Sequence, residues 1–206
     1  PLDNGETAIL SKSIKETATS LGIDHDAYLS LIEPLVESWP KIAADVMSPL
    51  HFPKHPLFMA QFGLNAMKSA SWVANRFSTE KAKGLWAGMA AHSIQPLTNY
   101  STAAIGMVLS AVGHIHGWPI PKGGSQSIAN ALASYFVSLG GKIETGFMVQ
   151  SLNQLPSSNA VLFDVTPKQL LQIAGDCFSP LYKWQLERYR YGMGVFKIDW
   201  ALSGPI

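Results

Sequence analysis

Apolar residues recur every three or four positions through the first part of the chain, the period of an amphipathic helix. We expect a first helix that starts at Asn4 or Thr7 and stops at Gly22, and a second that starts at Asp24 or Asp26. Pro34 must kink or restart the second helix. Further helices are predicted over residues 42–47, over the long apolar pattern of 57–76, over 81–94 after a cap at Ser78, and over 101–116.

The pattern changes after Gly117. Pro119 and Pro121 favour an extended backbone, and Ser125 can then cap a helix that the pair Gly140-Gly141 ends. Beyond this helix, short alternating or continuous apolar runs predict strands. The predicted strands cover residues 142–145, 147–152, 160–165 and 194–202, and two short helices, 166–174 and 179–188, are expected between the last two. These patterns predict a mostly helical α+β fold.

The segments after Gly117 carry a family resemblance. The order Pro-Lys-Gly-Gly (121–124), an amphipathic helix, Gly-Gly-Lys-Ile-Glu-Thr-Gly (140–146) and Val-Gln-Ser-Leu (149–152) resembles the middle of FAD-dependent phytoene-dehydrogenase-like oxidoreductases, relatives of the amine-oxidase flavoproteins. Residues 160–167 look like the apolar strand and proline-containing turn that follow in that family. The resemblance extends over essentially the whole chain. It implies a helical cap over residues 1–116, the central α/β segment of an FAD-binding domain over 117–175, and the start of a substrate-domain sheet over 176–206.

The resemblance suggests three groups of cofactor-binding residues. Lys122, Gly123 and Gly124 precede a helix, where free backbone N–H groups and the helix dipole favour an anion, although the residues alone favour an ordinary glycine-containing loop and helix cap. The resemblance implies that they lie near FAD or at a domain interface. It also implies that the backbone of Val149 contacts the adenine end of FAD, whereas the residue alone indicates only a strand valine.

The third group is the turn Asp164, Thr166 and Pro167. In the family the matching turn passes close to the cofactor, so the resemblance implies the same for these residues. Asp164 departs from the small residue that many relatives carry, and by itself it is typical of a turn or a helix cap.

The composition is that of a globular protein and limits the choice of partners. Of 206 residues, 47% are hydrophobic and 14% are charged, which is enough to build a core. A net charge of +1 gives no basis for nucleic-acid binding. The single Cys177 excludes an intrachain disulfide and fits a reducing compartment, so we expect a cytoplasmic protein. The apolar run 103–112 is too short to cross a bilayer, and peripheral attachment to a membrane stays open.

Two other chemistries have no support in the sequence. His114 and His116 point to different sides of a helix, and His51 and His55 lie in a proline-rich loop with no neighbouring carboxylate or cysteine, so we expect no metal site. No Gly-x-Ser-x-Gly motif indicates a serine hydrolase. The aromatic and methionine side chains between Phe58 and Met89 fit either core packing or the wall of an apolar substrate pocket.

The resemblance therefore implies a flavin-dependent oxidoreductase of the dehydrogenase or desaturase kind. FAD would accept a hydride from an apolar substrate, and we nominate no catalytic side chain. The family's Gly-x-Gly-x-x-Gly fingerprint does not occur in these residues. We thus expect an interior piece of a longer flavoprotein that does not hold FAD by itself and that self-associates through exposed domain edges. The alternatives are a non-catalytic helical interaction module and a fragment that is inactive by itself.

Overall fold

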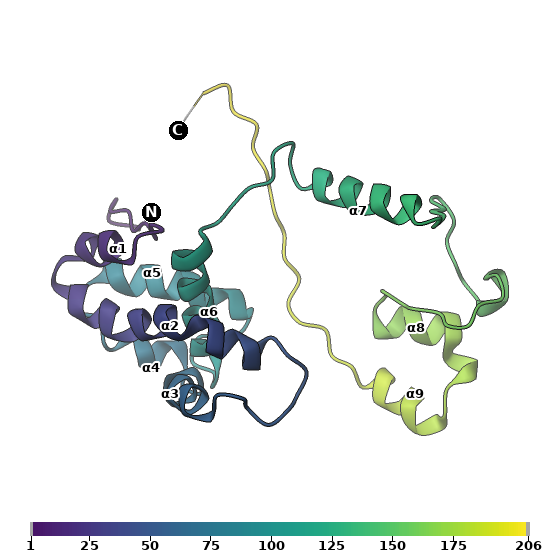
Figure 1. The fold of residues 1–206 in the computed structure, drawn as a ribbon, viewed down its shortest axis with the longest axis horizontal. Helices are drawn as coiled ribbons and strands as arrows, with labels where there is room; N and C mark the ends of the chain where they lie inside the picture. The colour runs from purple at the N-terminus through teal and green to yellow at the C-terminus, as the bar shows by residue number, and fades with distance from the viewer. Residues whose placement is uncertain (1, 205–206) are drawn as a thin grey trace. The chain divides into compact units, whose positions relative to one another are not determined.

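The computed structural model describes residues 2–204, and its regular elements there are α-helices and short 3-10 turns (Figure 1). The chain divides into two compact units, Pro1–Ile120 and Pro121–Ile206, and each is described by itself. The first unit holds α1 (Ile14–Ser20), α2 (His25–Val46), α3 (Pro56–Ala66), α4 (Ala70–Ala74), α5 (Glu80–Ala90) and α6 (Thr102–His116), with 3-10 turns η1 (Gly22–Asp24) and η2 (Ala91–Ser93). The second holds α7 (Gln126–Ser138), α8 (Pro167–Ala174) and α9 (Pro180–Glu187), with turns η3 (Leu152–Gln154) and η4 (Gly175–Cys177).

The predicted α+β fold is wrong, because residues 2–204 contain no strand. The runs 142–145, 147–152, 160–165 and 194–202 are non-helical apart from Leu152, which opens η3. Alternation of apolar residues shows only that a segment suits a sheet, whereas a strand also needs a neighbour that pairs with its N–H and C=O groups. These runs have no such neighbour in the described chain. The α/β segment and the sheet expected after Gly117 are therefore replaced by helices joined by irregular chain.

Helix α6 is the centre of the first unit, where α2, α3, α4 and α5 all pack against it. Small residues make this possible, since Ala103, Gly106, Ser110 and Ala111 are buried along it. The indole of Trp86 from α5 lies directly on Gly106, where a Cβ would come within 3.0 Å of the ring. Its Nε1 donates a hydrogen bond of 2.9 Å to the carbonyl of Ala70 in α4. One indole therefore joins three helices.

A buried carboxylate connects η1 to the start of α5. Asp24 accepts hydrogen bonds from the amides of Ser78 and Thr79 at 2.7 and 2.8 Å and from the Thr79 hydroxyl at 2.6 Å. Burial would raise the pKa of Asp24, but these hydrogen bonds outweigh burial and lower it. Thr79, rather than Ser78 as predicted, caps α5, because its Oγ1 accepts from the amide of Ala82.

Pro34 does not restart the second helix, and the separate helix expected over 42–47 is the end of the same helix, since α2 runs continuously through Pro34 and Pro40. Each internal proline costs roughly 3 kcal/mol. Burying a large apolar side chain stabilises by about 1.5–3 kcal/mol, and a full stripe of them outweighs both prolines. The stripe on α2 consists of Tyr28, Leu31, Ile32, Leu35, Trp39 and Ile42.

Two other helix predictions need correction. The first helix begins at Ile14 rather than at Asn4 or Thr7, because the Ser13 hydroxyl accepts a hydrogen bond from the amide of Glu16 and caps it there. The long helix expected over 57–76 is split into α3 and α4. Phe62 of α3 is buried in the core, whereas Trp72 of α4 lies at the surface with the Lys68 ammonium 3.8 Å from its ring centroid.

The proline-rich loop after α2 is wrapped around the buried carboxylate of Asp45. The amides of Lys54 and His55 donate to it at 2.8 and 2.9 Å, and His51 Nε2 lies 3.0 Å from Oδ1. The expectation that these histidines have no neighbouring carboxylate is therefore wrong. Even so, no group of three or more ligating side chains able to hold a metal ion occurs in residues 2–204.

This arrangement shifts two pKa values in opposite directions. Burial would raise the pKa of Asp45, but the hydrogen bonds of Lys54, His55 and His51 outweigh it and hold the pKa at about 2. Both ring nitrogens of His51 face acceptors, the carbonyl of Pro49 at 2.7 Å and then the Asp45 carboxylate. Because only the imidazolium can donate to both, the pKa of His51 is raised.

We predict that Trp86→Ala lowers the free energy of unfolding of the first unit by about 3–5 kcal/mol, because the substitution leaves a cavity between three helices. The matched control is Trp72→Ala, which removes an exposed indole and should cost less than about 1 kcal/mol. Urea unfolding of both variants tests this. Equal losses would show that the core does not depend on Trp86.

A second prediction concerns pH. The raised pKa of His51 contributes stability that is complete below its ordinary value of 6.5 and is lost as pH rises through the folded-state value. The depressed pKa of Asp45 contributes stability above its ordinary value of 3.8, which is lost as pH falls toward about 2. Both contributions are therefore present between these two ordinary values.

The destabilisation caused by His51→Gln should consequently be larger near about pH 5.5 than at a pH above the raised folded-state pKa of His51, where the wild-type imidazole is neutral. Denaturant unfolding at both pH values measures it. His92→Gln, at an exposed position in η2, is the control and should show no such difference. A pH-independent effect of His51→Gln would contradict the charged contact with Asp45.

Candidate functional site

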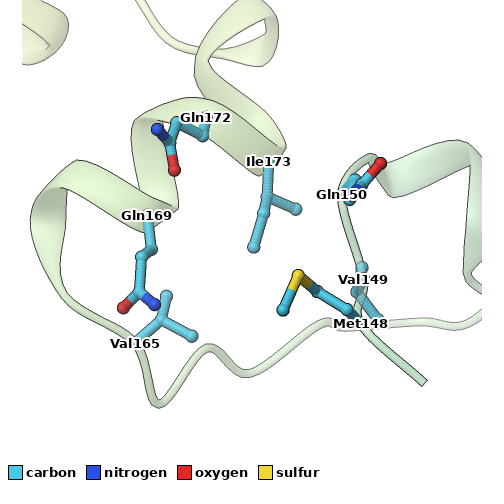
Figure 2. A pocket seen from close by; sticks show the side chains of 7 residues that line it. All are labelled: Met148, Val149, Gln150, Val165, Gln169, Gln172 and Ile173. Atoms are coloured by element: carbon cyan, nitrogen blue, oxygen red, sulfur yellow. The ribbon is translucent and has the colours of Figure 1, made fainter. Parts of the chain in front are cut away.

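Helix α8 of the second unit borders a hollow of about 510 Å³ (Figure 2). One wall comes from the helix and Val165, which lies two positions before it, and the other from the irregular run that precedes η3. Figure 2 shows Met148 extending from the second wall toward Ile173 of the helix. The lining residues are Met148, Val149, Gln150, Val165, Gln169, Gln172 and Ile173.

Local capping fixes the helix wall. The Thr166 hydroxyl accepts from the amide of Gln169, and the Gln169 side-chain oxygen accepts from the amide of Thr166 at 3.1 Å, which completes a capping box. Pro167 follows at the first helical position, where its missing N–H costs nothing. Gln169, Gln172 and Ile173 then share one helix face, as their spacing of three and four residues requires.

A second capping box fixes the opposite wall. Ser151 caps η3, and the side-chain oxygen of Gln154 accepts from the amides of Gln150 and Ser151 at 2.7 and 3.1 Å. These bonds tie down the chain immediately after Val149. The N–H and C=O groups of Val149 make no hydrogen bond to any residue in 2–204. The hollow is thus bordered by a main chain that is held at one end and free to bind at Val149.

A smaller hollow of about 220 Å³ adjoins the first, since Val149, Val165 and Ile173 line both. Among its lining residues only Asp164 is ionisable. The remaining walls are Leu155, Val161, Leu162 and Phe163.

The structure brings together some of the residues that the sequence indicated. Val149 lines both hollows and Asp164 lines the smaller one. Thr166 and Pro167 line neither hollow and instead form the start of α8. Residues that are separated by 15 positions in the sequence therefore meet at one place.

Lys122, Gly123 and Gly124 are not among the lining residues of either hollow. They form a turn before α7 in which the Gly124 amide donates to the carbonyl of Pro121 at 3.0 Å. Both glycines have positive φ, +87° and +81°, which a residue with a side chain rarely adopts. Ser125 occupies the N-cap position of α7, but its side chain makes no capping hydrogen bond.

Gln169, Gln172 and Ile173 were not predicted from the sequence as site residues. A usable signal was present, because Thr166-Pro-Lys-Gln169 has the spacing of a capping box. Starting the helix there places the three side chains on one face. The side chain of Met148 had no comparable signal, since its direction depends on the irregular run before η3.

The larger hollow suits a neutral ligand with hydrogen-bonding edges. None of its lining side chains is ionisable, and amide groups of Gln150, Gln169 and Gln172 are mixed with apolar ones. The free donor and acceptor of Val149 lie close together on one residue, which matches the alternating donors and acceptors on the edge of a heterocyclic base.

Comparison of the chain with models of protein families, with curated proteins and with solved structures gave no match. No helix in residues 2–204 is long and apolar enough to span a membrane.

We predict that Gln169→Ala frays the first turn of α8, because the amide of Thr166 loses its acceptor. The cost should be about 0.5–2 kcal/mol, as for other capping substitutions. Hydrogen exchange of the α8 amides measures it. Gln172→Ala changes the same residue type on the same wall without a capping contact, so faster exchange in both variants would show that the capping box does not hold the helix.

Proposed function

We propose that this chain forms part of an FAD-dependent oxidoreductase similar to the phytoene-dehydrogenase-like enzymes, and that the hollow beside α8 takes the adenine end of the cofactor. In the complete enzyme FAD would accept a hydride from an apolar substrate. The isoalloxazine supplies that chemistry when FAD is bound, while the residues here hold and orient the other end of the molecule. No catalytic side chain is assigned in this segment.

The observation that carries the proposal is that Val149 lines one hollow together with Asp164 and Val165, the first two residues of the turn 164–167. The resemblance assigns both segments to the surroundings of FAD on sequence grounds. Their proximity in the structure is an independent reason to place them at one ligand, since neither segment contains a sequence signal for the other.

The chemistry of the hollow fits adenine better than it fits the phosphates of FAD. A purine needs a flat apolar space and a few hydrogen-bonding groups at its edge, and Val149 offers one free N–H and one free C=O. Ile173, Met148 and Val165 supply apolar surface beside them. A pyrophosphate instead favours cationic side chains or a glycine turn at a helix N-terminus.

Only the family resemblance supports an apolar substrate and FAD as the hydride acceptor. Phe62 lies in the core of the first unit and Trp72 at its surface, so neither adds evidence for a substrate pocket. We propose accordingly that this segment is inactive by itself and binds FAD weakly.

A second candidate function is a helical interaction module, which one observation favours. Helix α7 has no buried residue and displays an apolar stripe to solvent. An exposed stripe of this kind is typical of a helix that docks on a partner. Its members are Ile128, Leu132, Tyr135, Phe136 and Leu139.

We predict that AMP and FAD, added to the isotopically labelled chain, shift the NMR signals of residues 148–150 and 165–173 and leave those of the α7 stripe unchanged. Without the pyrophosphate contacts, Kd should be about 1 mM or weaker, equivalent to about −4 kcal/mol. The chain purified alone should accordingly show no flavin absorbance.

Val149→Pro removes the proposed N–H donor and should abolish these shifts. Phe147→Pro makes the same change in the same irregular run, outside the hollow, and should leave AMP binding intact. Shifts that occur mainly on α7, or no shifts with either ligand, would reject the flavoprotein proposal and favour the interaction module.

A further inference from the structure

Residues 194–202 form an extended, fully solvent-exposed stretch near the end of the described chain, drawn in yellow in Figure 1. No main-chain hydrogen bond joins this stretch to any other residue in 2–204. Four of its five large apolar side chains nevertheless occupy alternate positions, and the fifth, Val195, falls on the same alternation as Lys197 and Asp199. Phe196, Ile198, Trp200 and Leu202 are 89%, 57%, 77% and 54% exposed.

Contacts between side chains two residues apart show which positions share a side. The Lys197 ammonium lies 2.9 Å from the carboxylate of Asp199, and just upstream the rings of Tyr189 and Tyr191 are 5.3 Å apart. Such contacts are those of an extended chain, in which alternate side chains point the same way. Lys197 and Asp199 therefore lie on one side, and the apolar residues 196, 198, 200 and 202 on the other.

The sequence of this stretch is complementary to itself when it is reversed. Suppose that two copies run antiparallel with Ile198 of one opposite Ile198 of the other. A residue a given number of positions before Ile198 in one copy then faces the residue the same number of positions after Ile198 in the second copy. Lys197 then faces Asp199 of the second copy, and Phe196 faces Trp200. Opposite charges and aromatic pairs directly across from each other are the combinations that stabilise antiparallel strands.

We propose that two copies of this chain associate through residues 194–202, paired antiparallel about Ile198. The main-chain groups that have no partner in one chain would bond to those of the other, and the twofold symmetry gives each contact twice. The Lys197 and Asp199 pairs would occupy the outer face. The apolar side chains of both copies would gather on the opposite face and be partly removed from water.

Charge selects this arrangement over the alternatives. A parallel pair in register would place Lys197 against Lys197 and Asp199 against Asp199, and like charges directly opposite one another are unfavourable. An isolated two-stranded ribbon is only marginally stable, so the association should be weak and visible at high protein concentration. It requires neither FAD nor the hollow beside α8.

Cross-linking tests the register directly. In a Cys177→Ser background, Ile198→Cys would place two thiols opposite each other within reach of a disulfide. Val195→Cys places its thiol opposite Ala201 of the second copy, so the two introduced cysteines, one at position 195 of each copy, are far apart. We expect Ile198→Cys to give a covalent dimer under mild oxidation and Val195→Cys to remain mostly monomeric. Equal cross-linking of the two variants would overturn the proposal.

Charge exchange tests the pairing without a cross-link. Lys197→Asp and Asp199→Lys each turn two attractive pairs into two repulsive ones, and either should weaken dimerisation in sedimentation equilibrium by about tenfold. The double variant restores opposite charges across the ribbon and should recover the wild-type affinity.

Three results would overturn the proposal. The first is a chain that stays monomeric at the highest concentration tested, and the second is a double variant no better than either single one. The third is a dimer that survives Ile198→Pro and is lost instead on Leu162→Pro, which would place the interface at the exposed run 160–165.

Discussion

The first unit depends on the packing of the Trp86 indole against Gly106 of α6, where the absence of a side chain lets the ring approach the helix backbone. Trp86 lies against the backbone of α6 at Gly106, while its N–H group reaches the carbonyl of Ala70. A Cβ at position 106 would lie 3.0–3.2 Å from the indole and from Ala90, closer than ordinary van der Waals contact, so the ring would have to shift. Loss of the Ala70 carbonyl as an acceptor would leave a buried N–H unsatisfied, at a cost of about 1–3 kcal/mol. Because α2 and α3 pack against the same α6, this contact also sets where their apolar stripes are buried.

The second unit is held together differently. Among its described residues only Ala174 and Gly175 are buried, and α8 and α9 begin at the side-chain caps Thr166 and Ser179 rather than at a shared core. Two capping boxes, at Thr166 and Ser151, position the walls of the hollow. A site built in this way has an ordered main chain and a free donor and acceptor at Val149, but little buried area to hold a ligand by itself. This explains why we expect weak binding from the isolated segment and tight binding only with further contacts to the cofactor.

Features that depend on residues close together in the sequence were predicted well, whereas features that depend on contacts between distant residues were not. Helices α6 and α7 follow from apolar spacing, and α8 and α9 also from the side-chain caps Thr166 and Ser179, because those interactions lie within a few residues of one another. The continuity of α2 through two prolines depends on burial against other helices, and the strands depend on partners that the alternation at 194–202 cannot supply. For the site, the sequence indicated Val149, the turn at Asp164 and the helix over 166–174, while the contribution of Gln169, Gln172 and Ile173 depends on residues 148–150 lying beside that helix. The glycine turn at Lys122 lines neither hollow. Glycines in the sequence indicate where the backbone can turn, but they do not indicate which other residues that turn will contact.

The central claim is that the hollow beside α8 receives a heterocyclic base. Intermolecular nuclear Overhauser effects between the ring protons of AMP and the methyl groups of the chain measure this directly. The account predicts contacts from the adenine protons to the methyl groups of Met148, Val149 and Ile173, with none to Ile128 or Leu132 on α7. Ribose 5-phosphate, which lacks the base, should produce no contact at these methyl groups. Contacts spread over both sets of methyl groups, or equal contacts with ribose 5-phosphate, would contradict the claim.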